Sequence, residues 1–212
     1  MSYLVSYTQL SPNHSGGRTR VISRITPHCA VGQISCQSLG EIFSKESRQA
    51  SANYGIGFDG KVGMYVPEEY RSWCTSSNDN DQRAITIECA SEKTSPYKFN
   101  DNVYTTLVDL CTDICERYSK KKLLWIPDQK KALDYDTGLD EMLLTVHRWF
   151  SATECPGEWL IKKLPELSKT VTDKLQNKRL YRVQIGAFTI KKNAEKMVDM
   201  AKQAGFTDAF IV

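Results

Sequence analysis

The sequence lacks several features that would assign it to other classes of protein. No apolar run approaches the roughly 20 residues of a membrane-spanning helix, and the first residues do not show the basic-then-apolar order of a signal peptide. The formal net charge of +3 is too small to indicate a nucleic-acid partner. We therefore expect no nucleic-acid binding, no membrane insertion and no signal peptide, with synthesis in the cytoplasm.

Regularly spaced cysteine pairs are also missing. The chain has seven cysteines, an odd number at irregular spacings, and this favours reduced thiols over a disulfide framework. Cys111 and Cys115 fall on the apolar face of a predicted helix, where cysteine is usually buried as a small hydrophobic residue. A structural protein whose thiols only fill its core is therefore one interpretation of the chain.

What the sequence does contain is an alternation of strand and helix patterns. Hydrophobic residues make up 41% and charged residues 25%, as in a globular protein. The patterns predict strands at 20–28 and 84–90, a hairpin at 54–66 and a long helix at 101–119. We predict an α/β fold for residues 1–175, with a mixed central β-sheet flanked by helices.

The pattern changes after the polar residues 176–179. An alternating strand at 181–188, an amphipathic helix at 189–205 and a second strand from 208 follow. We predict a small βαβ unit over residues 180–212. So short a unit buries little surface alone, and it should dock on the first domain or pair with another chain.

Histidine is scarce, and two of the three histidines stand at the ends of predicted extended segments. His28 ends one such segment and His147 follows "LLTV", whereas His14 lies in a polar loop and is interpreted as a solvated turn residue. Taken singly, such a histidine is more often a hydrogen-bonded core residue than a ligand. Cys155 changes this balance, because two imidazoles and one thiolate with an open fourth position form a catalytic zinc site.

A site of this kind needs further groups for catalysis. Zinc lowers the pKa of its bound water to about 7 and polarises a substrate carbonyl, and a donor is needed where charge develops on the carbonyl oxygen. Tyr54 and Thr153 could supply hydroxyls, although residues in such places usually serve packing and turns. A cysteine hydrolase, with Cys155 or Cys29 as nucleophile and a histidine as base, fits the same residues.

Four motifs occur in the order typical of one enzyme family. These are "PHCAVG", "SLGEIFSKESRQASANYGIGFDGKVGMYVPEEYRSW", "AITIECA" and "VHRWFSATECPGEWL". Over most of residues 18–165 the chain resembles the type-2 N-acetylmuramoyl-L-alanine amidases, which include phage lysins and peptidoglycan recognition proteins. The resemblance implies a Zn²⁺-dependent hydrolase that acts on peptidoglycan and cuts the amide between N-acetylmuramic acid and L-alanine.

The resemblance also implies roles for particular residues. His28, His147 and Cys155 match the zinc ligands, and Tyr54 and Thr153 match the catalytic residues that assist at the carbonyl. Some relatives carry lysine where Thr153 stands. Many relatives also carry a histidine after the tryptophan of "RSW", where this chain has cysteine. Recognition proteins that bind peptidoglycan without cutting it typically lack the cysteine ligand, so that interpretation is the weaker one.

The C-terminal segment is similar to the first half of a SPOR repeat, a module that binds the glycan strands of peptidoglycan. This similarity implies wall binding, or self-association as a homodimer if two half-modules complete one sheet. With the absence of a signal peptide, it leads us to expect a phage-type endolysin. Such a protein stays in the host cytoplasm until release and then cuts the wall, here expected to be that of a Gram-positive bacterium.

Overall fold

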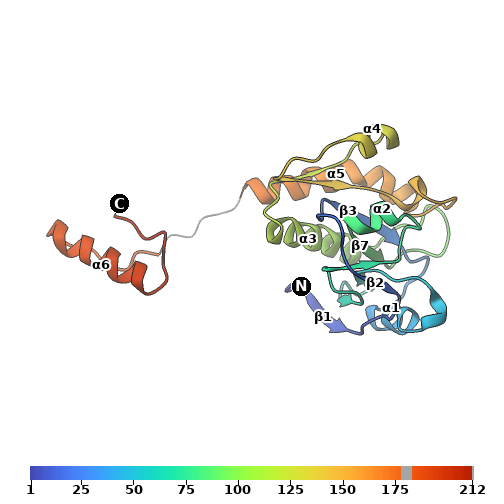
Figure 1. The fold of residues 1–212 in the computed structure, drawn as a ribbon, viewed down its shortest axis with the longest axis horizontal. Helices are drawn as coiled ribbons and strands as arrows, with labels where there is room; N and C mark the ends of the chain where they lie inside the picture. The colour runs from blue at the N-terminus through green and yellow to red at the C-terminus, as the bar shows by residue number, and fades with distance from the viewer. Residues whose placement is uncertain (178–182, 212) are drawn as a thin grey trace. The chain divides into compact units, whose positions relative to one another are not determined.

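The computed structural model describes residues 1–177 and 183–211, which belong to two compact units, Met1–Asn177 and Lys178–Val212 (Figure 1). The first unit contains a seven-stranded sheet in the order β1-β5-β4-β7-β3-β9-β8 and a two-stranded sheet of β2 and β6. The strands are β1 (Val5–Thr8), β2 (His14–Gly17), β3 (Arg24–Cys29), β4 (Tyr54–Ile56), β5 (Val62–Met64), β6 (Tyr70–Ser72), β7 (Ala84–Cys89), β8 (Lys122–Leu124) and β9 (Glu141–Leu144).

The large sheet is mixed, as predicted. β3 pairs in parallel with β7 and β9, and β7 pairs in parallel with β4, whereas β4 and β5 form an antiparallel hairpin. The hairpin turns at Asp59 and Gly60, and Gly60 has a φ of +81°, a conformation that glycine adopts without the strain a side chain would impose. The predicted α/β class is therefore confirmed.

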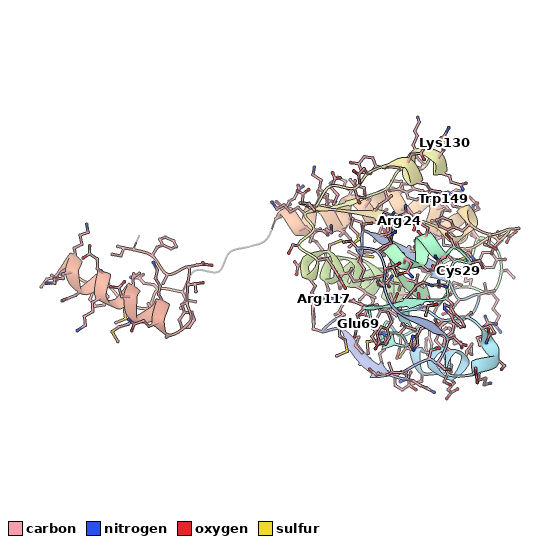
Figure 2. The ribbon with its side chains drawn as sticks, in the orientation of Figure 1. Arg24, Cys29, Glu69, Arg117, Lys130 and Trp149 are labelled. Carbon is pink, nitrogen blue, oxygen red and sulfur yellow. The ribbon has the colours of Figure 1, made fainter. Side chains whose placement is uncertain are left out.

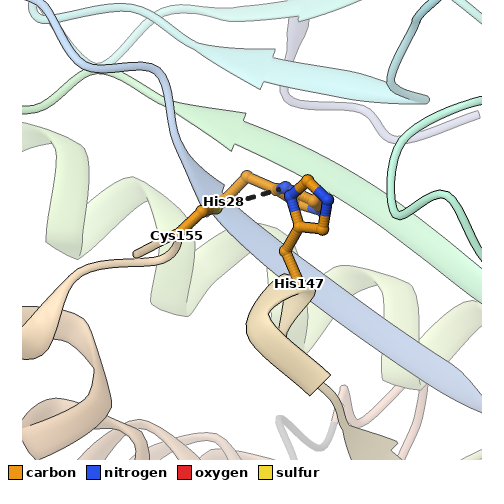
Figure 3. A group of neighbouring side chains, drawn as sticks. All are labelled: His28, His147 and Cys155. Atoms are coloured by element: carbon orange, nitrogen blue, oxygen red, sulfur yellow. Dashed lines mark hydrogen bonds between the residues drawn. The ribbon is translucent and has the colours of Figure 1, made fainter. Parts of the chain in front are cut away.

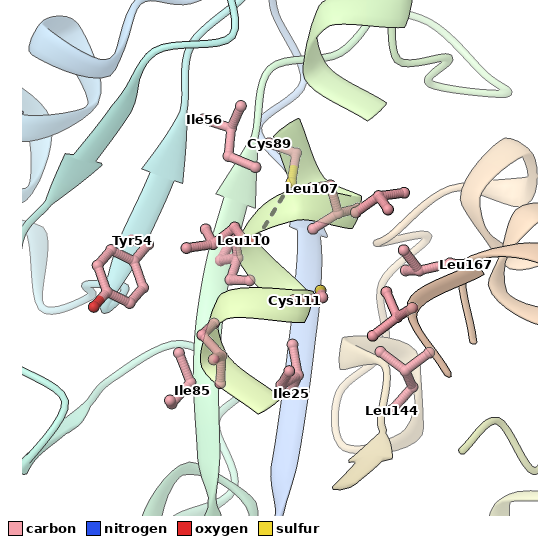
Figure 4. Packing of buried hydrophobic residues seen from close by; sticks show 14 of the residues in the cluster. Ile25, Tyr54, Ile56, Ile85, Cys89, Leu107, Leu110, Cys111, Leu144 and Leu167 are labelled. Atoms are coloured by element: carbon pink, nitrogen blue, oxygen red, sulfur yellow. Dashed lines mark hydrogen bonds between the residues drawn. The ribbon is translucent and has the colours of Figure 1, made fainter. Parts of the chain in front are cut away.

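Helices cover both faces of this sheet. They are α1 (Cys36–Phe43), α2 (Asn78–Arg83), α3 (Asp101–Arg117), α4 (Gln129–Asp134) and α5 (Glu158–Gln176), with short 3₁₀ turns η1 (Glu46–Arg48) and η2 (His147–Trp149). α3 begins where the Asn100 side chain accepts a hydrogen bond from the Val103 N–H. Its apolar face then packs with α5 on one face of the sheet, and Figure 4 shows Leu107 and Leu110 against the central strands.

The strand register decides which side chains share a face. Ile25, Tyr54 and Ile87 all belong to the face packed against α3. Because side chains alternate along a strand, His28 and Glu88, which stand opposite each other in β3 and β7, lie on the other face. That second face is shared with α2 and the loops around β6, so it can hold polar groups.

A buried ionic cluster closes the α3 side of the sheet. The Glu68 carboxylate, on a side chain only 5% exposed, accepts hydrogen bonds from Tyr54, Tyr118 and both terminal nitrogens of Arg117. Arg117, labelled in Figure 2, also binds Asp113 one turn back on α3. Burial alone would raise the pKa of Glu68, but the bonds from Arg117 and Tyr54 outweigh it and lower the pKa.

The second unit contains α6 (Lys191–Gln203), which agrees with the predicted helix. Within the predicted βαβ unit, residues 183–188 and 208–211 form no strand, and residues 181, 182 and 212 lie outside the described residues, so the βαβ arrangement stays a prediction. Among the described residues, no helix has the length and apolar character needed to cross a bilayer.

We expect Glu68→Gln to destabilise the first unit by about 1.5–3 kcal/mol, because it removes one of the two carboxylates that pair with Arg117 and the charged acceptor of the buried Tyr54 hydroxyl. Urea unfolding followed by tryptophan fluorescence measures the change. The control is Asp173→Asn, which breaks an exposed pair with Lys169 and should cost less than about 1 kcal/mol. Equal effects from both variants would show that the cluster does not stabilise the fold.

The same cluster should make stability sensitive to acid. Because the pKa of Glu68 is lower in the folded protein, its contribution is complete above the unfolded value of about 4.3 and is lost as the pH falls further. Unfolding midpoints measured between pH 3 and pH 6 should therefore fall more steeply for wild type than for Glu68→Gln. Parallel pH profiles for the two proteins would exclude this origin of acid sensitivity.

Candidate metal centre

The three residues predicted as metal ligands meet at one point. His28, His147 and Cys155 each offer a ligand atom, and these atoms all lie within 4.8 Å of one another (Figure 3). Nδ1 of His28 is 3.4 Å from Sγ of Cys155, and the two imidazole rings are 4.9 Å apart between centroids. We call this set the metal trio.

A buried network of side-chain hydrogen bonds helps to position the trio. The Thr26 and Thr145 hydroxyls, from β3 and the residue after β9, lie 2.7 Å apart in the buried interior, and the Asn80 side chain bonds to both. This network aligns the ends of the parallel strands β3 and β9. His28 and the start of η2 therefore lie at the same edge of the sheet. The Arg148 N–H then donates to the Cys155 carbonyl and closes the loop that carries the thiol.

The geometry of the trio fits a zinc ion. Two tetrahedral ligands at about 2.1 and 2.3 Å from Zn²⁺ stand roughly 3.6 Å apart, close to the 3.4 Å between His28 Nδ1 and Cys155 Sγ. Nε2 of His147 is buried and has no hydrogen-bond partner, a costly state that a bound cation would relieve. Two neutral imidazoles and one thiol are donors that suit zinc.

The protonation states of the trio also fit this chemistry. Burial, with a smaller effect of His147, lowers the pKa of His28 to about 3, and burial lowers the pKa of His147 as well. Both rings are therefore neutral and free to ligate. Hydrogen bonding with Cys29 and then burial raise the pKa of Cys155, so cation binding must release its proton.

Glu88 belongs to the same site, although the sequence reasoning did not select it. Its carboxylate lies 3.9 Å from Nδ1 of His28 and its side chain is 17% exposed. Burial raises the pKa of this carboxyl to about 7, although the charge of Arg48 lowers it in part, and a cation in the trio would lower it further. The signal in the sequence was a charged residue inside the apolar strand "AITIECA".

Cys74 is a second residue that the sequence reasoning left without a role. Its Sγ lies 3.4 Å from Nε2 of His28 and 4.0 Å from Oε1 of Glu88. With His28 and Glu88 it forms a second group whose ligand atoms lie within 4.8 Å. If His28 uses Nδ1 for a metal shared with Cys155, then Nε2–H can donate to Cys74, which would fix the tautomer.

The structure does not bring Tyr54 to the trio, and its predicted catalytic role is not carried further. Its side chain lies on the sheet face opposite His28, where Figure 4 shows it among the core residues. Its hydroxyl donates to Glu68 at 2.6 Å and accepts a bond from the Ser2 N–H. The register of β4 sets this outcome, because a tyrosine one position away would point to the other face.

Thr153 does lie in the loop that carries Cys155. Its hydroxyl accepts a hydrogen bond from the Cys155 N–H at 3.2 Å and so holds the turn. It also lines a pocket of about 240 Å³ with Tyr97 and Glu158. Its catalytic role stays a prediction.

His14 stands apart from these groups. It lies in β2, where its ring stacks on Tyr70 at 5.0 Å and its Nδ1 accepts from the Gly16 N–H.

Comparison with known proteins decides the family. The sequence pattern of the N-acetylmuramoyl-L-alanine amidase family matches residues 18–158, the span that holds the whole trio. The chain belongs to this family. The SPOR domain pattern matches residues 160–212, which include most of α5 of the first unit. Among curated proteins, none matches the chain.

Solved structures share the fold of this amidase. A mutant endolysin from Bacillus subtilis has a TM-score of 0.55 at 13% identity, covering 78% of this chain and 97% of its own. The Staphylococcus aureus hydrolase AmiA, in complex with its ligand, has a TM-score of 0.54 at 16% identity, covering 80% and 82%. PlyL has 0.52 at 12%, covering 82% and 98%. At these identities the similarity shows the fold alone.

We expect Cys74→Ala to weaken zinc binding by the amidase about 10- to 100-fold, because His28 loses the acceptor that orients its ring. Cys74→Ser keeps an acceptor and should lose less. Competition with a chelator of known affinity measures both changes. Unchanged affinity in Cys74→Ala would remove the orienting role. Binding that fails in Cys74→Ala but survives in Cys155→Ala would place the metal in the second group.

Proposed function

We propose that this protein is a zinc-dependent N-acetylmuramoyl-L-alanine amidase that hydrolyses the bond between N-acetylmuramic acid and L-alanine in peptidoglycan. The observation that carries the proposal is the convergence of two histidines and a cysteine on one point in a chain of the amidase family. Such a set leaves a coordination position open for catalysis.

In this mechanism His28, His147 and Cys155 would hold the ion. Zinc there would polarise the scissile carbonyl and lower the pKa of the attacking water to about 7. Glu88 stands beside His28 with a carboxyl whose pKa burial has raised. It can accept a proton from the water and deliver it to the leaving amine of L-alanine.

We propose that Thr153 assists at the carbonyl oxygen. Its oxygen already accepts a bond from the Cys155 N–H, which leaves the hydroxyl proton to donate to developing negative charge.

The cysteine-hydrolase alternative is disfavoured by the electrostatics of the same residues. A nucleophilic cysteine needs a lowered pKa and a histidine able to become an imidazolium. Here the pKa of Cys155 is raised, and that of its neighbour His28 is lowered to about 3. The thiol is therefore suited to a metal and unsuited to attack on its own. The binding-only alternative is disfavoured by the presence of Glu88 beside the trio.

The setting that we propose is lysis of a bacterial wall by a phage-type endolysin, kept in the host cytoplasm until release. Support comes from the endolysin among the structures that share the fold and from the SPOR match, which we interpret as a wall-binding segment. A Gram-positive target and homodimer formation through residues 180–212 stay predictions.

Metal removal separates the proposed functions. After chelation, wild type should lose amide hydrolysis on purified cell walls and regain it with added zinc. In Cys155→Ala the zinc content should fall from about one ion per chain to background, and activity should be lost. The control is Cys115→Ala, which removes a buried thiol of α3 and should retain both zinc and activity. Measurement combines zinc analysis with detection of new L-alanine amino termini. Hydrolysis that survives chelation would overturn the metal mechanism.

We expect Glu88→Gln to reduce kcat by about 10²- to 10⁴-fold, the usual contribution of a general acid–base group, with zinc content unchanged. The control is Glu92→Gln, an exposed residue of the following loop, which should behave as wild type. Rates on a soluble muramoyl peptide and zinc analysis supply the two measurements. Full activity in Glu88→Gln would assign the proton transfer to another group.

A further inference from the structure

Cys29, labelled in Figure 2, directly follows the ligand His28 at the end of β3. Because side chains alternate along a strand, its thiol belongs to the face packed under α3, where the residue is 7% exposed. Cys155 reaches both residues. Its Sγ lies 3.4 Å from Nδ1 of His28, and its thiol is hydrogen-bonded to the Cys29 side chain within the apolar cluster that both cysteines share. The proposed zinc ligand is therefore in direct contact with a second thiol.

Cys29 has another thiol neighbour in Cys89 of β7, which stands opposite it in the parallel register. Both of these residues are fixed by the β3–β7 ladder, and Cys89 lies fully buried in the core (Figure 4). A disulfide brings its two sulfurs to about 2.05 Å, and paired strands adjust to this only at the cost of backbone hydrogen bonds. Cys155 is partly exposed and lies in the loop between η2 and α5. A small oxidant can reach it there, and the loop can close the remaining gap.

The His28 ring separates Cys155 from the third nearby thiol, that of Cys74. Sγ of Cys74 lies 3.4 Å from Nε2 of His28, whereas Sγ of Cys155 lies 3.4 Å from Nδ1. These two nitrogens belong to different edges of the imidazole, so the ring stands between the two sulfurs. Cys29 meets Cys155 without such a barrier.

Building on the proposed zinc amidase, we propose that Cys29 and Cys155 form an oxidative modification site, in which a hydroperoxide converts the two thiols into a disulfide. The thiolate is the form of cysteine that binds a metal, and a disulfide sulfur carries no such charge. The bond would leave the ion with His28 and His147 alone, and zinc would be released. A thiol reductant that cleaves the disulfide would restore the ligand.

The chemistry balances with hydrogen peroxide as the only oxidant. The Cys155 sulfur attacks one peroxide oxygen, the O–O bond breaks, and the products are a sulfenic acid on Cys155 and one water. The Cys29 sulfur then attacks the Cys155 sulfur and the S–O bond breaks. The departing hydroxide takes up the Cys29 proton and leaves as a second water. The two thiols lose two electrons, which reduce one peroxide to two waters.

The contact with Cys29 also protects Cys155 from irreversible damage. A sulfenic acid that meets no second thiol is oxidised further to a sulfinic acid, which thiols do not reduce. Capture by Cys29 ends the reaction at a disulfide, from which the ligand can be recovered. In the setting proposed above, a reducing cytoplasm would keep both thiols free, and oxidation would begin only after release.

The test treats the purified full chain, loaded with zinc, with hydrogen peroxide and then alkylates the remaining thiols. Tryptic digestion places Cys29 in peptide 25–45 and Cys155 in peptide 149–162, and mass spectrometry detects whether the two peptides are linked. Peptide 25–45 also contains Cys36, so fragmentation of the linked pair and the variant Cys29→Ala identify the bonded residue. A chelating dye measures the zinc released in the same samples.

Wild type should form the link between Cys29 and Cys155 as it releases zinc. Reduction with dithiothreitol followed by zinc addition should then restore most of the bound metal. Cys29→Ala should release zinc without a link and accumulate the sulfinic acid of Cys155, so that the recovery on reduction is lost. The matched control is Cys89→Ala, which removes the other thiol beside Cys29 and should behave as wild type.

The inference is overturned if wild type keeps both thiols under peroxide or releases zinc without the link. A bond from Cys155 to Cys36 or Cys89, or full recovery of zinc by Cys29→Ala after reduction, would overturn it as well. The peptide map of wild type decides the matter even if Cys29→Ala fails to fold. If the purified chain binds no zinc, the proposed function fails, and the linked peptide then decides the inference by itself.

Discussion

The parallel pairing of β3 with β7 and β9 is the constraint on which the site depends. Parallel strands end at one edge, so this pairing delivers His28, Glu88 and the segment leading to His147 to the same place. The threonine hydroxyls at positions 26 and 145 fix the alignment from inside, in a layer without access to water. A shift of one residue in β3 would turn His28 toward α3 and leave the other donors without it.

The two faces of the large sheet have different roles, packing on one and the candidate metal site on the other. One face carries the apolar packing under α3 and α5, together with the charge cluster around Glu68. The other carries the neutral imidazoles, the thiols of Cys74 and Cys155 and the carboxyl of Glu88. This separation keeps the strong Arg117 charge away from the trio, where low dielectric would let it disturb the protonation of the ligands.

The sequence predicted the class of fold, and it selected the three residues that the structure brings together at one point, because both depend on strong local signals. Alternation, helical periodicity and a turn at Asp59-Gly60 indicated the elements, and rare histidines at strand ends indicated the donors. The face on which Tyr54 points depends on register, which periodicity alone does not determine. Cys74 and Glu88 approach His28 only through strand pairing and the β6 loop, and no spacing along the chain records that approach.

The trio unites two parts of the chain that are far apart, since His28 and Cys155 are separated by 127 positions. An ion bound by both residues would cross-link most of the amidase unit. A long cross-link lowers the conformational entropy of the unfolded chain and so stabilises the folded state. The native form would then grow more stable with the free zinc concentration around it. Catalytic competence and resistance to unfolding would rise and fall together with metal supply.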